Sequence, residues 1–234
     1  MSLRPRRLSL SMGAKRHTGL SVACGAILFL SSVVIVPAPA QVRATTDSDT
    51  AYAPLLDRLI HFDTLMDFRA LRFGYAHSAA YDPSSSVDAV LHRQLHNALG
   101  KGDLKTVRVL ADSLLVRDPV DIDARVLAAY AATQAGDSVA GQRHAAIARG
   151  LGRSFDGAHR GASLETPIVL IAASEEESFG RLNGLEYADS TKLADCPAGY
   201  CDVVVFRNPK TGTDTTIFFD LTLQVRWMLQ HSKK

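Results

Sequence analysis

Apolar residues recur at helical spacing through the first two thirds of the chain, and two neighbouring stretches show the pattern most clearly. Each stretch keeps its apolar residues on one helical face, and the segment Gly100-Lys101-Gly102 separates them. The pattern predicts two amphipathic helices joined by a short turn. The first face carries Val87, Val90, Leu91, Leu95, Ala98 and Leu99, and the second carries Leu104, Val107, Leu110, Ala111, Leu114 and Leu115.

Two shorter helices are expected before this pair. The first spans residues 52–61, and the second begins near Asp67, whose carboxylate can cap exposed backbone amides. Phe68, Leu71 and Tyr75 then share one stripe of the second helix.

The pattern changes near residue 152, where β-branched residues begin to cluster in short runs broken by Gly, Pro and Asn. Residues 166–172 predict a buried strand, and residues 200–206 with 215–221 predict a hairpin. Ser174 and Glu177 have the spacing of a capping box for a short helix that ends near Gly184. We therefore expect an α+β fold, with N-terminal α-hairpin repeats followed by a small antiparallel β-rich region.

A period of 34 residues links the helical pairs. Ala98, Gly102, Asp103 and Ala111 recur as Ala132, Gly136, Asp137 and Ala145. This spacing resembles that of tetratricopeptide repeats, with one unit at residues 88–121 and a second at 122–155. The resemblance implies helical hairpins that bury their apolar stripes by stacking on neighbours.

The first forty residues have the features of a signal peptide. An apolar run at residues 20–36 follows a basic segment, and Pro37-Ala38-Pro39-Ala40 offers the small residues that a signal peptidase accepts. We expect cleavage after residue 40 and export to the periplasm or the medium; an uncleaved N-terminal anchor is the alternative. The mature chain would contain a disordered start at 41–51, a helical region at 52–155 and an α/β-rich region at 156–234.

Removal of the leader changes the charge balance. The chain has 26 Lys and Arg against 24 Asp and Glu, and five of the basic residues belong to the leader, which leaves a net charge near −3. Without a basic stripe, nucleic acid is not expected as a partner. Later apolar stretches are too short to span a membrane.

Cleavage would also remove Cys24 and leave Cys196 and Cys201, with four residues between them. In an oxidising compartment this pair predicts a local disulfide. A zinc ribbon would need a second cysteine pair, which the sequence lacks.

His92 and His96 lie four residues apart on one predicted helix, a spacing that can direct two imidazoles toward one metal. Arg93 stands where a zinc protease has Glu, and the sequence identifies no third ligand. In the repeat register both histidines face a concave groove together with Asp123, Tyr130 and Thr133. Ordinary groove histidines are the preferred interpretation, so no metal or cofactor is assigned.

Other polar groups have structural interpretations. Arg72, Tyr75 and Tyr81 could form a recognition patch, but hydrogen bonding to loop carbonyls is preferred. Glu175, Glu176 and Glu177 suit the first turn of a helix, where the dipole stabilises carboxylates. The sequence contains neither the Gly-x-Ser-x-Gly elbow of a hydrolase nor a Gly-rich phosphate loop, so no catalytic residue is assigned.

Short motifs from Asp67-Phe68 to Phe218-Phe219 carry a further resemblance. Through them the chain resembles a family of exported bacterial proteins described only as a domain of unknown function. The resemblance covers most of residues 52–230 and brings no known activity. We expect a non-catalytic exported module that binds another protein or peptide; the alternative is a metal-dependent hydrolase using His92 and His96. The matching residues include Asp67-Phe68, Leu71-Arg72, Tyr75, Ser78, Tyr81, Pro83, the segment at 120–124, Gly136-Asp137, Arg143-His144, Gly150-Leu151, Asp156-Gly157, the acidic start at 175–177, and Pro209-Lys210-Thr211-Gly212 with Phe218-Phe219.

Overall fold

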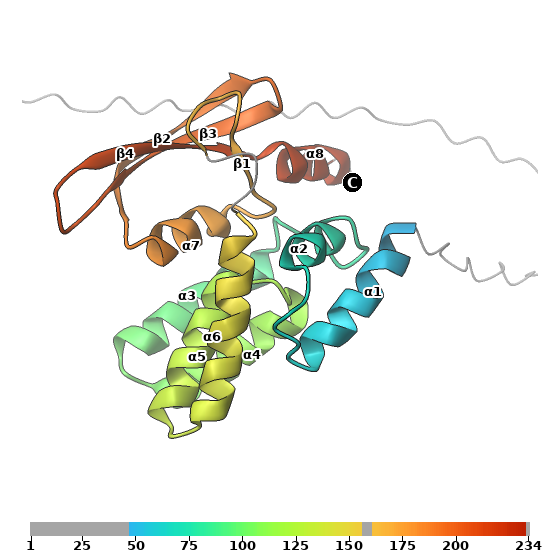
Figure 1. Cartoon of the computed structure of the whole chain (residues 1–234), viewed down its shortest axis with the longest axis vertical. Coiled ribbons are helices and arrows are strands. Elements are labelled where there is room, and N and C mark those ends of the chain that lie inside the picture. Colours follow the sequence, from blue (N-terminus) through green and yellow to red (C-terminus); the bar gives the residue numbers. More distant parts are fainter. Residues whose placement is uncertain (1–46, 156–160, 233–234) are drawn as a thin grey trace, which may run out of the picture. The chain divides into compact units, whose positions relative to one another are not determined.

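Helices form the first part of the chain and a sheet with two further helices forms the last part (Figure 1). The computed structural model describes residues 47–155 and 161–232, so the predicted signal peptide lies outside the described residues. The α+β class is confirmed. The helices are α1 (Asp47–Ile60), α2 (Phe68–Ala76), α3 (Ser86–Gly100), α4 (Leu104–Arg117), α5 (Ile122–Gln134), α6 (Ser138–Arg153), α7 (Ser174–Leu182) and α8 (Thr222–His231), and the strands are β1 (Ile168–Val169), β2 (Glu186–Cys196), β3 (Gly199–Arg207) and β4 (Asp214–Asp220).

The two expected early helices are present. Asp67 caps α2, since its side chain accepts a hydrogen bond from the Ala70 amide at 2.9 Å. Helix α1 begins at Asp47, so residues 47–51 are helical and not disordered as the sequence suggested. Tyr52 is buried and its ring packs against Tyr75 at 6.1 Å between centroids, which holds this end of α1 on α2.

The 34-residue period appears as two helical hairpins with the same turn, α3 with α4 and α5 with α6. Gly102 and Gly136 both adopt positive φ, at 69° and 84°, a conformation that favours glycine. The following residues, Asp103 and Asp137, then cap the second helix of each hairpin. Each Gly-Asp pair therefore forms the same turn and the same helix cap.

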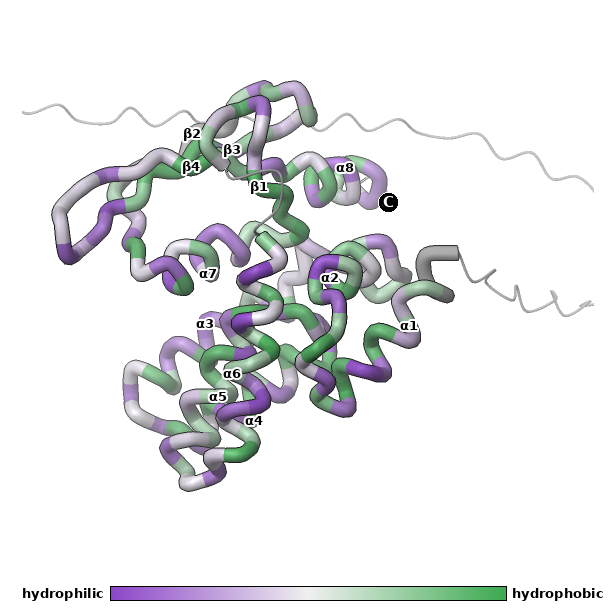
Figure 2. Tube along the Cα trace, viewed as in Figure 1, coloured by the Kyte–Doolittle hydropathy of each residue, from purple (hydrophilic) through white to green (hydrophobic). Residues whose placement is uncertain are grey.

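The sheet has the strand order β1-β4-β3-β2. The predicted hairpin is confirmed as β3 and β4, which pair antiparallel, but β1 pairs parallel with β4, so the sheet is mixed and not antiparallel throughout. Of the strand expected at residues 166–172, only Ile168 and Val169 are in β1. Leu170 and Ile171 are nevertheless buried, and Figure 2 shows the chain around β1 as a continuous apolar stretch.

Strand β2 and helix α8 were not predicted. β2 is rich in polar residues, lies at the sheet edge and pairs with β3 through irregular register near Asp189. The strand was not predicted because its composition is polar. An edge strand is stabilised by backbone pairing with its neighbour and needs few apolar side chains. The predicted disulfide is confirmed: Cys196 ends β2 and joins Cys201 of β3, which closes the turn between these strands.

Two apolar clusters form the core. The smaller one lies within α3, α4 and α5 and includes Leu95, Val107 and Leu114. The larger one joins α1, α2 and α6 to the sheet, with Leu71 and Phe219 fully buried in it. The change of composition near residue 152 therefore coincides with the end of α6, while the apolar core continues across it.

A buried ion pair connects α2 to α7 inside the larger cluster. Both Arg72 and Glu175 are almost completely buried, and Arg72 donates from Nε to Oε1 at 2.9 Å and from Nη2 to Oε2 at 2.7 Å. The predicted capping box is wrong: Ala173 occupies the N-cap position and no side chain caps the helix. Glu175 instead turns inward, where Oε2 also accepts the Ile171 amide at 2.8 Å. The start of α7 is thus held by a tertiary contact.

None of the helices in the described part of the chain has the length and apolar character needed to cross a membrane.

Candidate functional site

Three adjoining clefts form one groove between the helical hairpins and α7. The central cleft, of about 400 Å³, is lined by α3, the start of α5 and α7. It shares Ala89, His92 and Ser174 with a cleft of about 160 Å³ near the start of α3. At its other side it shares Asp123 and Arg181 with a cleft of about 80 Å³ that reaches Val126. His92 and Asp123 therefore lie where these clefts meet.

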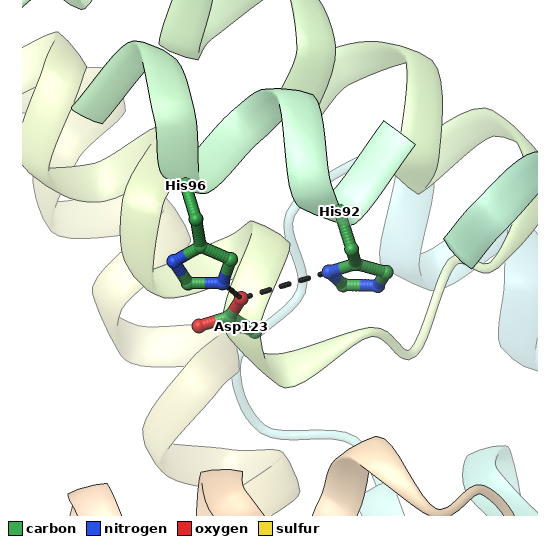
Figure 3. A group of neighbouring side chains, drawn as sticks. All are labelled: His92, His96 and Asp123. Atoms are coloured by element: carbon green, nitrogen blue, oxygen red, sulfur yellow. Dashed lines mark hydrogen bonds and ion pairs between the residues drawn. The ribbon is translucent and has the colours of Figure 1, made fainter. Parts of the chain in front are cut away.

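Helix α3 supplies the two histidines of the central cleft. Residues four apart lie one above the other on a helix, so His92 and His96 share a face. Ser85 marks the start of this helix, because its hydroxyl accepts a hydrogen bond from the Asp88 amide at 3.2 Å. Figure 3 shows both imidazole rings directed toward the carboxylate of Asp123.

The start of α5 supplies two carboxylates that meet these rings. Asp121 caps α5 by accepting the Ala124 amide at 2.9 Å, and its Oδ2 lies 2.7 Å from Nε2 of His92. Asp123 lies in the first helical turn, and its Oδ2 is 2.7 Å from Nε2 of His96 and 3.6 Å from Nδ1 of His92. The N-terminal end of a helix stabilises such negative charge. Both carboxylates are buried.

Arg181 of α7 closes this cluster from the opposite side of the groove. Its Nη2 lies 2.8 Å from Oδ1 of Asp123 and 3.5 Å from Oε2 of Glu177. The two oxygens of Asp123 are therefore divided, with Oδ1 facing α7 and Oδ2 facing the histidines.

The charges within the cluster are strongly coupled. Burial opposes a charge on His92, but hydrogen bonds from the ring to Asp121 and Asp123 outweigh burial and raise its pKa to about 10. Burial would raise the pKa of Asp123, yet the His92 hydrogen bond and the Arg181 charge outweigh it and lower that pKa. At neutral pH the His92 ring is therefore a cation beside the carboxylate of Asp123.

The cleft near the start of α3 is acidic. Asp82, Asp88, Asp118 and Asp121 contribute to its lining. Burial, and then the neighbouring charge of Asp121, raise the pKa of Asp118 well above its usual range. A positive group entering this cleft would relieve that unfavourable burial of carboxylates.

The other groove residues expected from the sequence separate in the structure. Tyr130 is 46% exposed and lies two turns beyond Asp123 on the same face of α5, but it lines none of the three clefts. Thr133 instead faces α6: its hydroxyl donates to the Ala129 carbonyl at 2.8 Å, and a Cβ at Gly141 would come within 2.3 Å of it. Thr133 is therefore not among the residues that the clefts bring together.

Arg72, Tyr75 and Tyr81 lie in the larger core cluster and not at the groove. Tyr75 donates to the Arg117 carbonyl at 3.4 Å, and the Tyr81 hydroxyl donates to the Ile171 carbonyl. The two rings meet edge to face at 5.7 Å. All three residues are at most 4% exposed, which agrees with the structural interpretation preferred for them.

Asp121, Arg181 and Glu177 also line the groove and were not predicted from the sequence as parts of it. A signal for Asp121 was available, because an Asp-x-Asp segment at a helix start places one carboxylate at the cap and another in the first turn. No local signal marks Arg181, since it reaches Asp123 across 58 residues of sequence.

Comparison with known proteins places the chain in a family. The family model described as domain of unknown function DUF4919 matches residues 40–229. The chain belongs to this family. No curated protein and no solved structure matches the chain. Membership confirms the expected domain of unknown function and identifies no activity.

Proposed function

We propose that this member of the DUF4919 family is an exported, non-catalytic module that binds an extended segment of another polypeptide. The observation that carries the proposal is the continuity of the three clefts through His92 and Asp123. A partner segment would lie along α3 and cross the start of α5, with Tyr130 at its far end. Aromatic side chains that are partly exposed are frequent contact residues in such interfaces.

Charge complementarity defines one feature of the partner. The cleft near the start of α3 holds Asp118 and Asp121, and burial already disfavours the charged form of Asp118. His92 already pairs with Asp121 in this cleft, and a Lys or Arg side chain would add a positive charge next to Asp118. We therefore propose a partner segment that places a basic residue there.

The resemblance to tetratricopeptide repeats and the expected export also support this proposal. The repeated turns at Gly102 and Gly136 suit hairpins that present a ligand groove. A disulfide between Cys196 and Cys201 suits an oxidising compartment, and the family match begins at residue 40, where the expected signal peptide ends.

Metal-dependent hydrolysis, the alternative from the sequence, has less support. Hydrolysis needs a base that takes a proton from the attacking water in addition to an ion. Glu177 is a carboxylate of the central cleft, but it lies 3.5 Å from Arg181 and its side chain is 61% exposed. Binding therefore accounts for the groove with fewer requirements.

Peptide selection on the mature chain tests the proposal. A displayed library of random peptides is selected on protein that carries a photoreactive residue at position 130, and the affinity of enriched peptides is measured by fluorescence anisotropy. Ala89→Trp fills the groove, because Ala89 is exposed on α3 where two clefts meet. Val109→Trp is the matched control on α4, at a position that is 64% exposed.

We expect enriched peptides to share a basic residue, to crosslink at position 130, and to lose binding to Ala89→Trp but not to Val109→Trp. Replacement of the basic residue in the peptide should weaken binding by at least about tenfold, as for other charge pairs at interfaces. Equal binding to the two tryptophan variants would show that the groove is not the polypeptide site.

A further inference from the structure

We propose that His92, His96 and Asp123 form a binding site for a divalent first-row transition-metal ion, with zinc as the probe ion. The proposal does not rest on polypeptide binding, because the ion alone tests it. The sequence identified two of the three ligands and assigned no metal. The third ligand, Asp123, comes from a different helix and is brought to the histidines only by the joint packing of α3, α4 and α5 in the smaller apolar cluster.

The donor atoms have the spacing that such an ion requires. One donor atom from each side chain lies within 4.8 Å of the other two. Ligand atoms at about 2.0–2.2 Å from a tetrahedral ion lie about 3.3–3.6 Å apart. Nδ1 of His92 and Oδ2 of Asp123 are already 3.6 Å apart, whereas Nε2 of His96 and Oδ2 are 2.7 Å apart and would separate slightly. The His96 side chain is 41% exposed and can make this adjustment.

A second layer of contacts holds two of these ligands in the required orientation. Nε2 of His92 donates to Asp121 at 2.7 Å, so Nδ1 is the nitrogen that faces Asp123. A carboxylate that accepts the second ring N–H is typical of metal-bound histidines. On the other side, Arg181 contacts Oδ1 of Asp123 and leaves Oδ2 directed at the two rings. Coordination would replace the proton on Nδ1 of His92, which would leave to solvent.

The donor set selects the class of ion. Two imidazole nitrogens with one carboxylate suit zinc and its neighbours in the first transition row, whereas calcium and magnesium prefer oxygen ligands alone. Three protein ligands leave at least one coordination position open. The cluster lies where the clefts meet, so this position would face the groove. The site would therefore present a Lewis-acidic ion to whatever occupies the groove.

The competing account is an ion-pair cluster in which protonated histidines connect α3 to α5 and no ion binds. The two accounts differ in their response to zinc. Titration calorimetry on tag-free mature protein stripped with a chelator measures affinity, and elemental analysis after gel filtration measures stoichiometry. Folding of every variant is checked by circular dichroism.

We expect one zinc per chain, and a loss of affinity of at least about tenfold in His92→Ala, in His96→Ala and in Asp123→Asn. The matched control is His61→Ala, because His61 lies 3.6 Å from Asp57 in an exposed histidine–carboxylate pair with no second histidine in it. This variant should bind zinc as the original chain does. Asp121→Asn keeps an oxygen for the helix cap and should weaken binding by about tenfold through His92.

Absence of stoichiometric zinc, or equal zinc affinity in His96→Ala and the original chain, would overturn the metal site. Either result would leave the polypeptide proposal intact, since Ala89→Trp tests that proposal through peptide affinity. If no peptide binds in the groove while zinc still binds, the polypeptide proposal fails and the metal site stands.

Discussion

Within residues 47–155 and 161–232, positive side chains meet buried carboxylates in two clusters that differ in what surrounds them. Arg72 and Glu175 lie inside the larger core, and the guanidinium also bonds Ser154 Oγ at 3.0 Å and the Val169 carbonyl at 3.2 Å. His92, His96 and Asp123 lie at the groove instead, and the two histidine side chains are 22% and 41% exposed.

This difference distinguishes charged groups that stabilise the core from charged groups that a ligand can reach. Every polar atom of Arg72 has a partner that the fold supplies, and Phe155 covers the guanidinium at 4.5 Å. At the groove the donors face a cleft and their hydrogen bonds can be exchanged. A buried pair whose bonds are complete stabilises one arrangement of the core, whereas a half-exposed cluster can accept an ion or a partner.

The largest expected effect follows from breaking the buried pair. Arg72→Met would leave the carboxylate of Glu175 buried without its cation, and we expect a loss of about 3–5 kcal/mol in the free energy of unfolding. Urea denaturation followed by circular dichroism measures the loss. The double variant Arg72→Met with Glu175→Gln should be less destabilised than the single one. A single variant within about 1 kcal/mol of the original chain would contradict a structural role for the pair.

Glu176 follows Glu175 in the chain and is also a buried carboxylate, but the charge with the largest effect on it is the carboxylate of Asp202 and not a cation. Burial, and then the charge of Asp202, raise the pKa of Glu176 to about 7. The folded state therefore holds this proton more tightly than the unfolded state, so stability is greatest below about pH 4.5 and falls as pH rises toward 7. Glu176→Gln should remove this dependence and raise stability at pH 8 by up to about 3 kcal/mol.

Thermal unfolding between pH 4.5 and 8 checks the Glu176 prediction. Glu186→Gln is the matched control, since that side chain is exposed on β2, whereas the charges that raise the pKa of Glu176 come from Asp202 and Glu177. An unchanged pH profile in Glu176→Gln would show that Glu176 does not retain its proton in the fold.

The disulfide offers a change that touches neither cluster. Cys196→Ser with Cys201→Ser opens the β2–β3 turn, and we expect a loss of about 2 kcal/mol because the unfolded chain is no longer constrained. Zinc affinity should not change. Nonreducing intact-mass analysis first establishes the bond, as the oxidised mature chain should weigh two hydrogens less than the reduced chain.

The smallest expected effect on stability comes from the groove cluster. His96→Ala removes a half-exposed partner of Asp123 and should cost only about 0.5 kcal/mol in metal-free protein, while it removes zinc-dependent stabilisation. Melting temperatures with and without zinc measure both quantities. A loss as large as that from Arg72→Met would instead place His96 among the structural residues and remove the contrast between the clusters.

Local signals were enough for most of the helices and for one hairpin. The apolar stripes of α3 and α4, the caps at Asp67 and Asp103, and the β3–β4 hairpin depend on neighbouring residues along the chain. The edge strand β2 was not predicted, because pairing with β3 stabilises it and its own sequence has no clear apolar pattern. The capping box at Ser174 failed because Ser174 is already the first helical residue, and the contact between Arg72 and Glu175 holds the start of α7 in that place.

By itself the sequence determined the 34-residue repeat of the Gly-Asp turns, the cysteine pair and the shared face of His92 and His96, since each follows from spacing along the chain. The repeat register placed Asp123 in the same groove, but only the tertiary structure decided that its carboxylate contacts both histidines and that Arg181 contacts it from α7. The physical reason is distance in sequence: helical periodicity specifies which residues share a face, whereas the packing of helices specifies which faces meet.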